Sequence, residues 1–107
     1  MSKKVAFVTG GTGGIGTAIC QSLVTSGYHV IAGYNSGGNH DKALTWQYKQ
    51  KELGFDIGVS YGDVTDFESC TNCIENVKEQ AGKPISILIN NAGITRDSQF
   101  KKMEINQ

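Results

Sequence analysis

The chain has 107 residues, of which 38% are hydrophobic, and its ten basic side chains balance ten acidic ones. This length leaves room for one small domain over residues 1–107, and a neutral chain gives no electrostatic reason to expect nucleic acid or an anionic membrane as a partner. No apolar stretch is long enough to span a bilayer, and the run after Met1-Ser2-Lys3-Lys4 is too short and too rich in glycine for a signal peptide. We therefore expect a cytoplasmic protein.

The first quarter of the chain predicts a buried strand, a tight turn and a helix. Val5–Val8 is continuously apolar, as in a strand buried on both faces of a parallel sheet. Five glycines follow between Thr9 and Gly16, and an amphipathic run, Ile15–Ser26, leads out of them. The helix would point its unpaired N–H groups and its positive dipole end at the turn, where an anion such as a pyrophosphate binds well. A glycine-rich loop without a ligand is the alternative.

The residues after the turn argue against a P-loop. Such a loop needs a Lys and then a Ser or Thr after its last glycine, whereas Gly16 is followed by Thr-Ala. Gly11, Gly13 and Gly16 match the pattern G-x-G-x-x-G only loosely. The wider spacing G-x-x-x-G-x-G is matched by Gly10, Gly14 and Gly16.

Strands and helices are predicted to alternate along the rest of the chain. The further strands are Tyr28–Gly33, Phe55–Tyr61 and Ile85–Ile89, and the further helices run from Asp41, as N-cap, to Leu53 and from Asp66 to Ala81. Helix ends are expected at Gly27, Gly54 and Gly82. This order predicts an α/β fold with a parallel sheet.

Apolar side chains at helical spacing predict which helix faces are buried. They are Ile15, Ala18, Ile19, Leu23 and Val24 in the first helix and Phe67, Cys70, Ile74, Val77 and Ala81 in the third. In the second helix, Leu44, Trp46 and Tyr48 are expected to pack rather than to contact a ligand. His29 and His40 are interpreted as structural.

The three cysteines do not suggest a disulfide framework. Cys70 and Cys73 have the C-x-x-C spacing of a redox or metal site, but no second cysteine or histidine pair accompanies them. Because they lie inside a helical pattern, we interpret them as ordinary helix residues and expect no metal site.

A second motif follows the fourth predicted strand. The strand Ile85–Ile89 ends in Asn90-Asn91-Ala92-Gly93, about 80 residues after the glycine turn. This quartet and the glycine turn preceded by Thr9 together resemble the short-chain dehydrogenase/reductase family over essentially the whole chain. The resemblance implies a Rossmann-type doubly wound parallel sheet, with strand order 3-2-1-4 in this chain and truncated relative to the family.

The resemblance also implies where a nicotinamide dinucleotide binds. The implied contacts are Gly10, Thr12, Gly13, Gly14, Ile15 and Gly16 in the turn, Asn35 and Ser36 after the second strand, Gly62, Asp63 and Val64 after the third, and Asn91, Ala92, Gly93, Ile94 and Thr95 after the fourth. The Asp63 carboxylate would accept a hydrogen bond from the adenine amino group. Simple capping of the turn by Asp63 is the alternative.

The choice between NADP and NAD depends on the residues after the second strand. Enzymes that use NAD usually carry an acidic residue about 20 residues after the turn, and none occurs between Gly10 and Asp41. We therefore expect NADP, with Asn35 and Ser36 donating hydrogen bonds to its 2′-phosphate; the nearest cation is Lys42. A solvated loop without cofactor contact is the alternative.

Within the family, the runs Gly10–Cys20 and Asn91–Asp97 resemble acetoacetyl-CoA reductases, which act in polyhydroxyalkanoate synthesis. This resemblance implies NADPH-dependent reduction of a 3-oxoacyl-CoA to the 3-hydroxyacyl-CoA by a homotetramer, with Asp97 close to the acyl-CoA. A 3-oxoacyl-carrier-protein reductase and a non-catalytic dinucleotide-binding fragment are the alternatives.

No catalytic residue can be assigned in this sequence. The family takes its proton from the Tyr of a Y-x-x-x-K motif, and no tyrosine here has a Lys four residues later. We therefore expect the chain to be the amino-terminal, cofactor-binding half of a reductase. The 107 residues alone are expected to be inactive and poorly stable.

Overall fold

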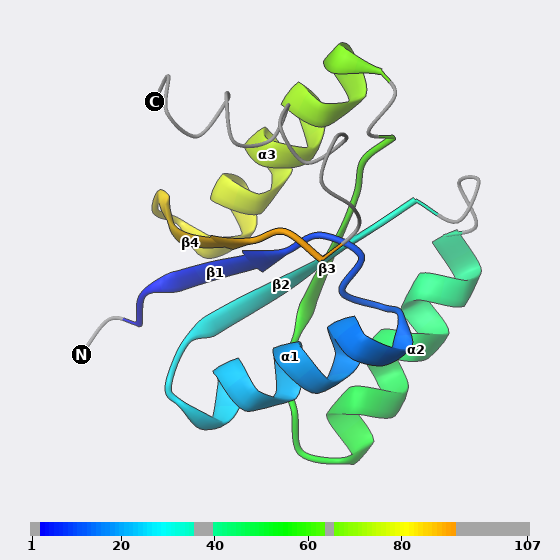
Figure 1. Cartoon of the computed structure of the whole chain (residues 1–107), viewed down its shortest axis with the longest axis vertical. Coiled ribbons are helices and arrows are strands. Elements are labelled where there is room, and N and C mark those ends of the chain that lie inside the picture. The colour runs from blue at the N-terminus through cyan, green and yellow to red at the C-terminus, as the bar shows by residue number, and fades with distance from the viewer. Residues whose placement is uncertain (1–2, 36–39, 64–65, 92–107) are drawn as a thin grey trace.

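A computed structural model of the protein describes residues 3–35, 40–63 and 66–91. Strands and helices alternate along them, as the sequence predicts (Figure 1). The strands are β1 (Val5–Val8), β2 (His29–Tyr34), β3 (Gly58–Tyr61) and β4 (Ile85–Ile89), and the helices are α1 (Gly14–Thr25), α2 (His40–Glu52) and α3 (Phe67–Ala81). None of these helices is both long and apolar enough to cross a membrane.

The four strands form one parallel sheet in the order β3-β2-β1-β4. Val5 of β1 pairs with His29 of β2 and with Ile85 of β4, and the pairing with β4 shifts register after Val5. The predicted strand order 3-2-1-4 is confirmed. Since β1 is central, the turn that follows it lies between the carboxyl ends of β2 and β4.

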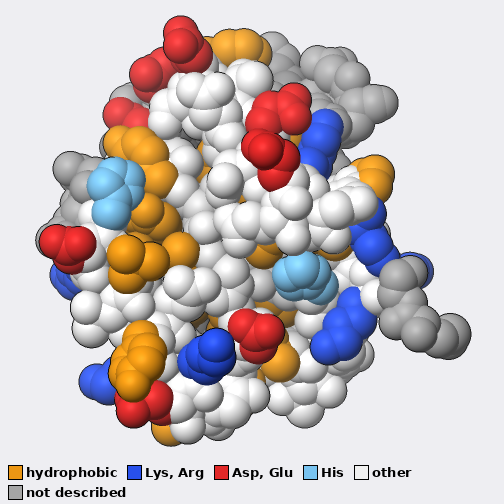
Figure 2. All heavy atoms as spheres, turned by 180° about the vertical axis from the view of Figure 1, so that it is seen from behind, with side chains coloured by type: hydrophobic (Ala, Val, Ile, Leu, Met, Phe, Trp, Pro, Cys, Tyr) orange, Lys and Arg blue, Asp and Glu red, His pale blue; other side chains and the backbone are white. Residues whose placement is uncertain are grey.

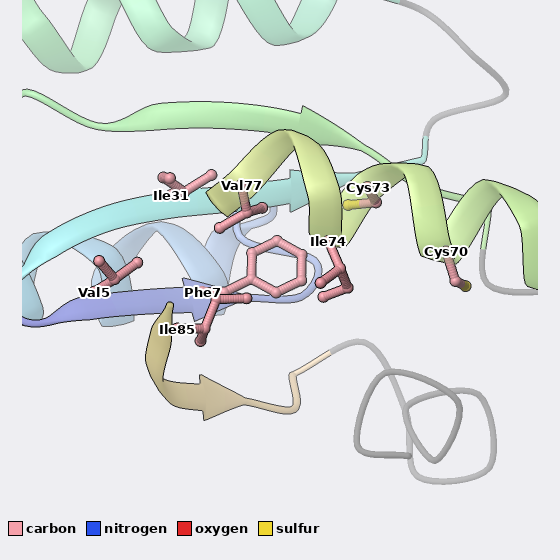
Figure 3. Close-up of a cluster of buried hydrophobic side chains, with 8 residues drawn as sticks. All are labelled: Val5, Phe7, Ile31, Cys70, Cys73, Ile74, Val77 and Ile85. Carbon is pink, nitrogen blue, oxygen red and sulfur yellow. The ribbon is translucent and has the colours of Figure 1, made fainter. Parts of the chain in front are cut away.

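Helices cover both faces of the sheet, with α1 and α2 on one side and α3 on the other (Figure 1). Every residue of β1 is buried because successive side chains point to opposite faces. Val5 and Phe7 pack under α3, whereas Ala6 and Val8 pack under α1. Figure 3 shows the ring of Phe7 among side chains of α3, β2 and β4.

The buried face of α1 differs from the predicted one. Ile15 is 74% exposed and Ala18 is also exposed, whereas Gly16 and Cys20 are buried. Because Gly16 packs directly against the turn, the helix is rotated so that Gly16 and Cys20, four residues apart, face the sheet. Ile19, Leu23 and Val24 are partly buried, as the periodicity predicts.

The predictions for α3 are confirmed for its N-cap and for most of its buried face. Asp66 is its N-cap, with a side chain that accepts from the Glu68 amide at 3.0 Å, and Cys70, Ile74 and Val77 are buried as predicted. Phe67, however, is 62% exposed. Cys73 is buried instead, where the helix approaches the sheet.

The region from α2 to β3 shows three further differences. Asp41 lies within the first turn of α2, so it is not the N-cap, and Leu44 and Tyr48 are exposed although Trp46 packs. The third strand begins at Gly58 rather than Phe55, because the Phe55 amide still donates to Gln50 at the end of α2 (2.9 Å).

Glycines with positive φ follow all three described helices, at the positions predicted (96° at residue 27, 95° at 54 and 73° at 82).

Candidate functional site

The two sequence motifs meet at the carboxyl end of β1. The amide of Thr9 donates to the carbonyl of Ile89 at 3.0 Å, and the Thr9 hydroxyl donates to the same carbonyl at 3.3 Å. That hydroxyl also accepts from the Asn91 amide at 3.0 Å, and the Asn91 side chain donates to the carbonyl of Gly10 at 3.1 Å. The polar residues after β4 are therefore attached directly to the glycine turn.

On its other side the turn lies against β2. The Gly11 amide donates to the Gly33 carbonyl at 3.0 Å, and a Cβ at Gly11 would lie 2.6 Å from the Cβ of Ala32. Gly10 has φ of 62°, in the left-handed region that favours glycine. The chain can turn back over the sheet only because these side chains are absent.

Gly16 lets α1 begin in contact with the turn. A Cβ there would clash with the Gly10 carbonyl oxygen and would lie 2.7 Å from the Cα of Gly11. No residue larger than glycine fits without moving the turn or the helix. The N-terminus of α1 is therefore held close to the ends of β1 and β4.

The start of α1 has the features of an anion site. Gly13 is the N-cap, no side chain caps it within the described part of the chain, and the first turn contains no acidic residue. Gly13 and Gly14 are exposed, and among the described residues a Cβ at Gly14 would meet nothing within 4 Å. Unpaired amides and the positive end of the helix dipole thus face open space, where a phosphate group can approach.

A hollow of about 210 Å³ lies beside this N-terminus, lined by Thr12, Gly13, Lys42, Ala43 and Trp46. Lys42, in the first turn of α2, is thereby brought next to the turn. The sequence identified Lys42 only as the nearest cation and assigned Trp46 to packing. The signal that was missed is their spacing, since residues four apart share one face of a helix.

The ends of β2 and β3 form the outer rim of this edge. The amide of Gly62 donates to the carbonyl of Tyr34 at 3.0 Å, which fixes the start of the loop after β3 beside β2. The Asp63 amide donates to the Ser69 hydroxyl at 2.8 Å, and the Asp63 carbonyl accepts from the Asp66 amide at 3.0 Å. The backbone at Asp63 is therefore anchored to the start of α3. Asn35 directly follows β2.

Several predicted site residues lie outside the described residues. They are Ser36, Val64, Ala92, Gly93, Ile94, Thr95 and Asp97.

Three rings pack together at the rim between β2, β3 and α2. The Tyr34 hydroxyl is 2.6 Å from Nδ1 of His40, and the ring centroid of Tyr61 is 5.7 Å from that of Tyr34 and 5.1 Å from that of His40. Histidine side chains lie at the surface on the face that Figure 2 shows, one of them against hydrophobic side chains. Burial raises the pKa of Tyr34, with smaller contributions from Cys73 and Tyr61. His40 is exposed, and its ring contacts with the two tyrosines agree with the structural role expected from the sequence.

Cys70 and Cys73 are buried on the face of α3 that packs against the sheet (Figure 3). Burial raises the pKa of each thiol to about 11, although the Ser60 hydroxyl partly opposes the rise at Cys73. Such thiols are almost fully protonated at neutral pH and are weak nucleophiles. In the described residues no group of three or more His, Cys, Asp or Glu side chains is arranged to hold a metal ion.

Known proteins are similar to this chain in sequence. Residues 4–107 match the family model of the short chain dehydrogenases. The chain is 48% identical over 103 residues to an acetoacetyl-CoA reductase of Cupriavidus necator, covering 96% of this chain and 41% of the relative. It is 49% identical to nodulation protein G of Azospirillum brasilense (97% and 41%) and 38% identical to a 3-oxoacyl-[acyl-carrier-protein] reductase of Haemophilus influenzae (97% and 40%).

Solved structures share the fold. A blue fluorescent protein from a metagenomic library, crystallised in complex with NADPH, superimposes with a TM-score of 0.72 at 33% identity, covering 87% of this chain and 37% of that one. An actinorhodin polyketide ketoreductase, also with NADPH, superimposes with a TM-score of 0.74 at 30% identity (88% and 36%). The chain thus spans about two fifths of the length of these relatives.

The family match covers nearly the whole chain, and it agrees with the strand order and with the contact between the glycine turn and the residues after β4. The chain belongs to the short-chain dehydrogenase family, whose members are oxidoreductases.

Proposed function

We propose that the glycine turn binds the pyrophosphate of NADPH and that the protein reduces a 3-oxoacyl-CoA, acetoacetyl-CoA, to the 3-hydroxyacyl-CoA. The observation that carries the proposal is the uncapped N-terminus of α1, which opens at Gly13 and Gly14, while the Asn91 side chain is bonded to Gly10 of the same turn. When bound, the nicotinamide supplies the hydride, and the protein supplies binding and orientation.

The residues proposed to contact the dinucleotide are those predicted from the sequence. They are Gly10, Thr12, Gly13, Gly14, Ile15, Gly16, Asn35, Ser36, Gly62, Asp63, Val64, Asn91, Ala92, Gly93, Ile94 and Thr95. The first turn of α1 would donate its amides to the pyrophosphate oxygens, and the half-buried Asp63 carboxylate would accept from adenine. The side chain of Asp97 is proposed to lie close to the acyl-CoA.

We propose Lys42 as the residue that favours NADPH over NADH. It lines the hollow beside Thr12 and Gly13, and an ammonium group there would attract a 2′-phosphate. This proposal adds a cation to the hydrogen-bond donors Asn35 and Ser36. NADPH in two structurally similar proteins is consistent with it.

The proposed substrate class is supported by a comparison of the sequence identities to two relatives. Identity to the acetoacetyl-CoA reductase is 48%, against 38% to the carrier-protein reductase. We propose that this chain supplies the dinucleotide-binding half of the reductase, because it spans 41% of the relative's length. An assembly of four copies remains a prediction from the resemblance.

A substitution that separates binding from folding tests the anion site. Gly14→Asp places a carboxylate in the first turn of α1, where it stabilises the helix by about 0.3–1 kcal/mol through the dipole. The same charge repels a pyrophosphate, so we expect the dissociation constant for NADPH to rise by at least about ten-fold while the urea midpoint is unchanged or higher. Gly14→Asn is the matched neutral control. Unchanged NADPH binding in Gly14→Asp would refute the proposed site.

The substrate is tested on the full-length reductase of which this chain is proposed to form the dinucleotide-binding half, by following NADPH oxidation with acetoacetyl-CoA and with the corresponding carrier-protein thioester. We expect the higher kcat/KM with the CoA ester. Equal or reversed values would favour the carrier-protein reductase, and binding of NADPH without turnover of either thioester would favour a non-catalytic binding protein.

A further inference from the structure

Trp46, the single tryptophan of the chain, connects α2 to the glycine turn. Its indole Nε1 donates to the hydroxyl of Thr17 at 3.0 Å, and that hydroxyl donates to the carbonyl of Gly13 at 2.6 Å. An indole N–H can only donate, whereas a hydroxyl can accept one hydrogen bond and donate its own proton. The three groups therefore form a chain of hydrogen bonds from the middle of α2 to the N-cap of α1.

The same side chain lies next to the proposed cofactor cation. Trp46 follows Lys42 by four residues, so the two share one face of α2, and both line the hollow with Thr12 and Gly13. The position of Lys42 relative to the turn therefore depends on how α2 is held there. The amides at the start of α1 belong to a different element, and the Gly13 carbonyl also accepts from the Thr17 amide at 2.8 Å, so we expect them to depend less on α2 than Lys42 does.

We propose that Trp46 is a positioning residue for dinucleotide choice: its hydrogen bond to Thr17 holds α2 where Lys42 can reach the 2′-phosphate of NADPH. The inference rests on the proposed binding of NADPH at the turn. NADH lacks the 2′-phosphate, so its affinity should depend little on this hydrogen bond.

Other contacts keep α2 in place when this hydrogen bond is lost. Gln50 is buried near the other end of α2 and accepts from the Gln21 side chain of α1 at 2.8 Å. Ala43 is also buried. Loss of the indole N–H is therefore expected to change the position of the Lys42 side chain relative to the turn without detaching the helix from the sheet.

The test is Trp46→Phe, which keeps an aromatic ring and removes the N–H. We expect the dissociation constant for NADPH, measured by calorimetry on the folded protein, to rise about five-fold, and that for NADH to change by less than about two-fold, since one hydrogen bond is lost. Thr17→Val removes the acceptor and should have the same effect, whereas Thr17→Ser should retain wild-type selectivity. Thermal melting of each variant checks that it is folded.

A double-mutant cycle with Lys42→Met separates positioning from general packing. If Trp46 acts through Lys42, adding Trp46→Phe to Lys42→Met should leave the NADPH affinity nearly unchanged. Equal weakening of NADPH and NADH by Trp46→Phe, or a full effect in the Lys42→Met background, would overturn the inference. If the wild type binds NADPH and both Trp46→Phe and Thr17→Val keep its selectivity, the inference alone is overturned. If the wild type binds no dinucleotide, the proposed function itself is refuted.

Discussion

At the scale of single residues, the site depends on where side chains are missing. Gly16 and Gly14 both lie in the first turn of α1, but their surroundings differ. A Cβ at Gly16 would clash with Gly10 and Gly11, whereas a Cβ at Gly14 would meet nothing within 4 Å in the part of the chain that the structure describes. We therefore expect Gly16→Ala to destabilise the protein by about 1–3 kcal/mol, because the turn or the helix must move.

Gly14→Ala is the matched control for this prediction. Alanine is a better helix former than glycine by up to about 1 kcal/mol, so this variant should be as stable as the wild type or more stable. Urea unfolding of the two variants measures the difference. If Gly16→Ala were as stable as Gly14→Ala, the close packing of α1 on the turn would be wrong.

At the scale of elements, glutamine side chains occupy part of the exposed edge of the sheet at β3. The Gly62 amide points toward β2, so alternation along the strand directs the carbonyls of Val59 and Ile57 away from the sheet. The Val59 carbonyl accepts from Gln80 of α3 at 2.8 Å, and the Ile57 carbonyl accepts from Gln47 of α2 at 3.0 Å. Two of the outward carbonyls are thereby occupied, which opposes pairing with a strand of another molecule at this part of the edge.

Removing one of these glutamines should promote self-association. We expect Gln80→Ala to associate at a lower protein concentration than the wild type in sedimentation velocity experiments, with a loss of stability of at most about 1 kcal/mol. Asn72→Ala, an exposed substitution on the same helix, is the control. Identical sedimentation of all three proteins would show that Gln80 does not protect the edge.

At the scale of the whole molecule, cysteines are buried on both faces of the sheet. Cys20 packs on the side of α1, and Cys70 and Cys73 pack on the side of α3. Burial raises the pKa of the Cys20 thiol from its ordinary value of 9.0 to about 12, and those of Cys70 and Cys73 to about 11. Above pH 9 the unfolded chain loses thiol protons that the folded protein keeps, so the free energy of unfolding falls as the pH rises.

Urea unfolding at pH 8 and at pH 10.5 measures this effect. Each fully buried thiol contributes a decrease of at most about 1.4 kcal/mol per pH unit above pH 9. Tyrosine and lysine side chains titrate in the same range, so the comparison is with Cys20→Ala, in which the decrease between the two pH values should be smaller. A decrease equal to that of the wild type would contradict the shifted pKa of Cys20.

Much of the fold and part of the candidate site could be predicted from the sequence, because they depend on local patterns. Continuous apolar strands, glycines at the helix ends and the two motifs after β1 and β4 predicted the alternation of elements, and family resemblance supplied the strand order. The meeting of Thr9 and Gly10 with Asn91 follows directly, since neighbouring parallel strands end at the same edge.

Only the tertiary structure decided which faces of the helices are buried and what lines the site. Periodicity placed Ile15, Ala18 and Phe67 toward the core, but the rotation of α1 depends on the contact of Gly16 with the turn, and Phe67 lies in the first turn of α3, next to its N-cap. Lys42 and Trp46 reach the glycine turn only because α2 packs beside α1. The hydrogen bond between Trp46 and Thr17 joins residues 29 positions apart, a distance over which local sequence patterns carry no information about contact.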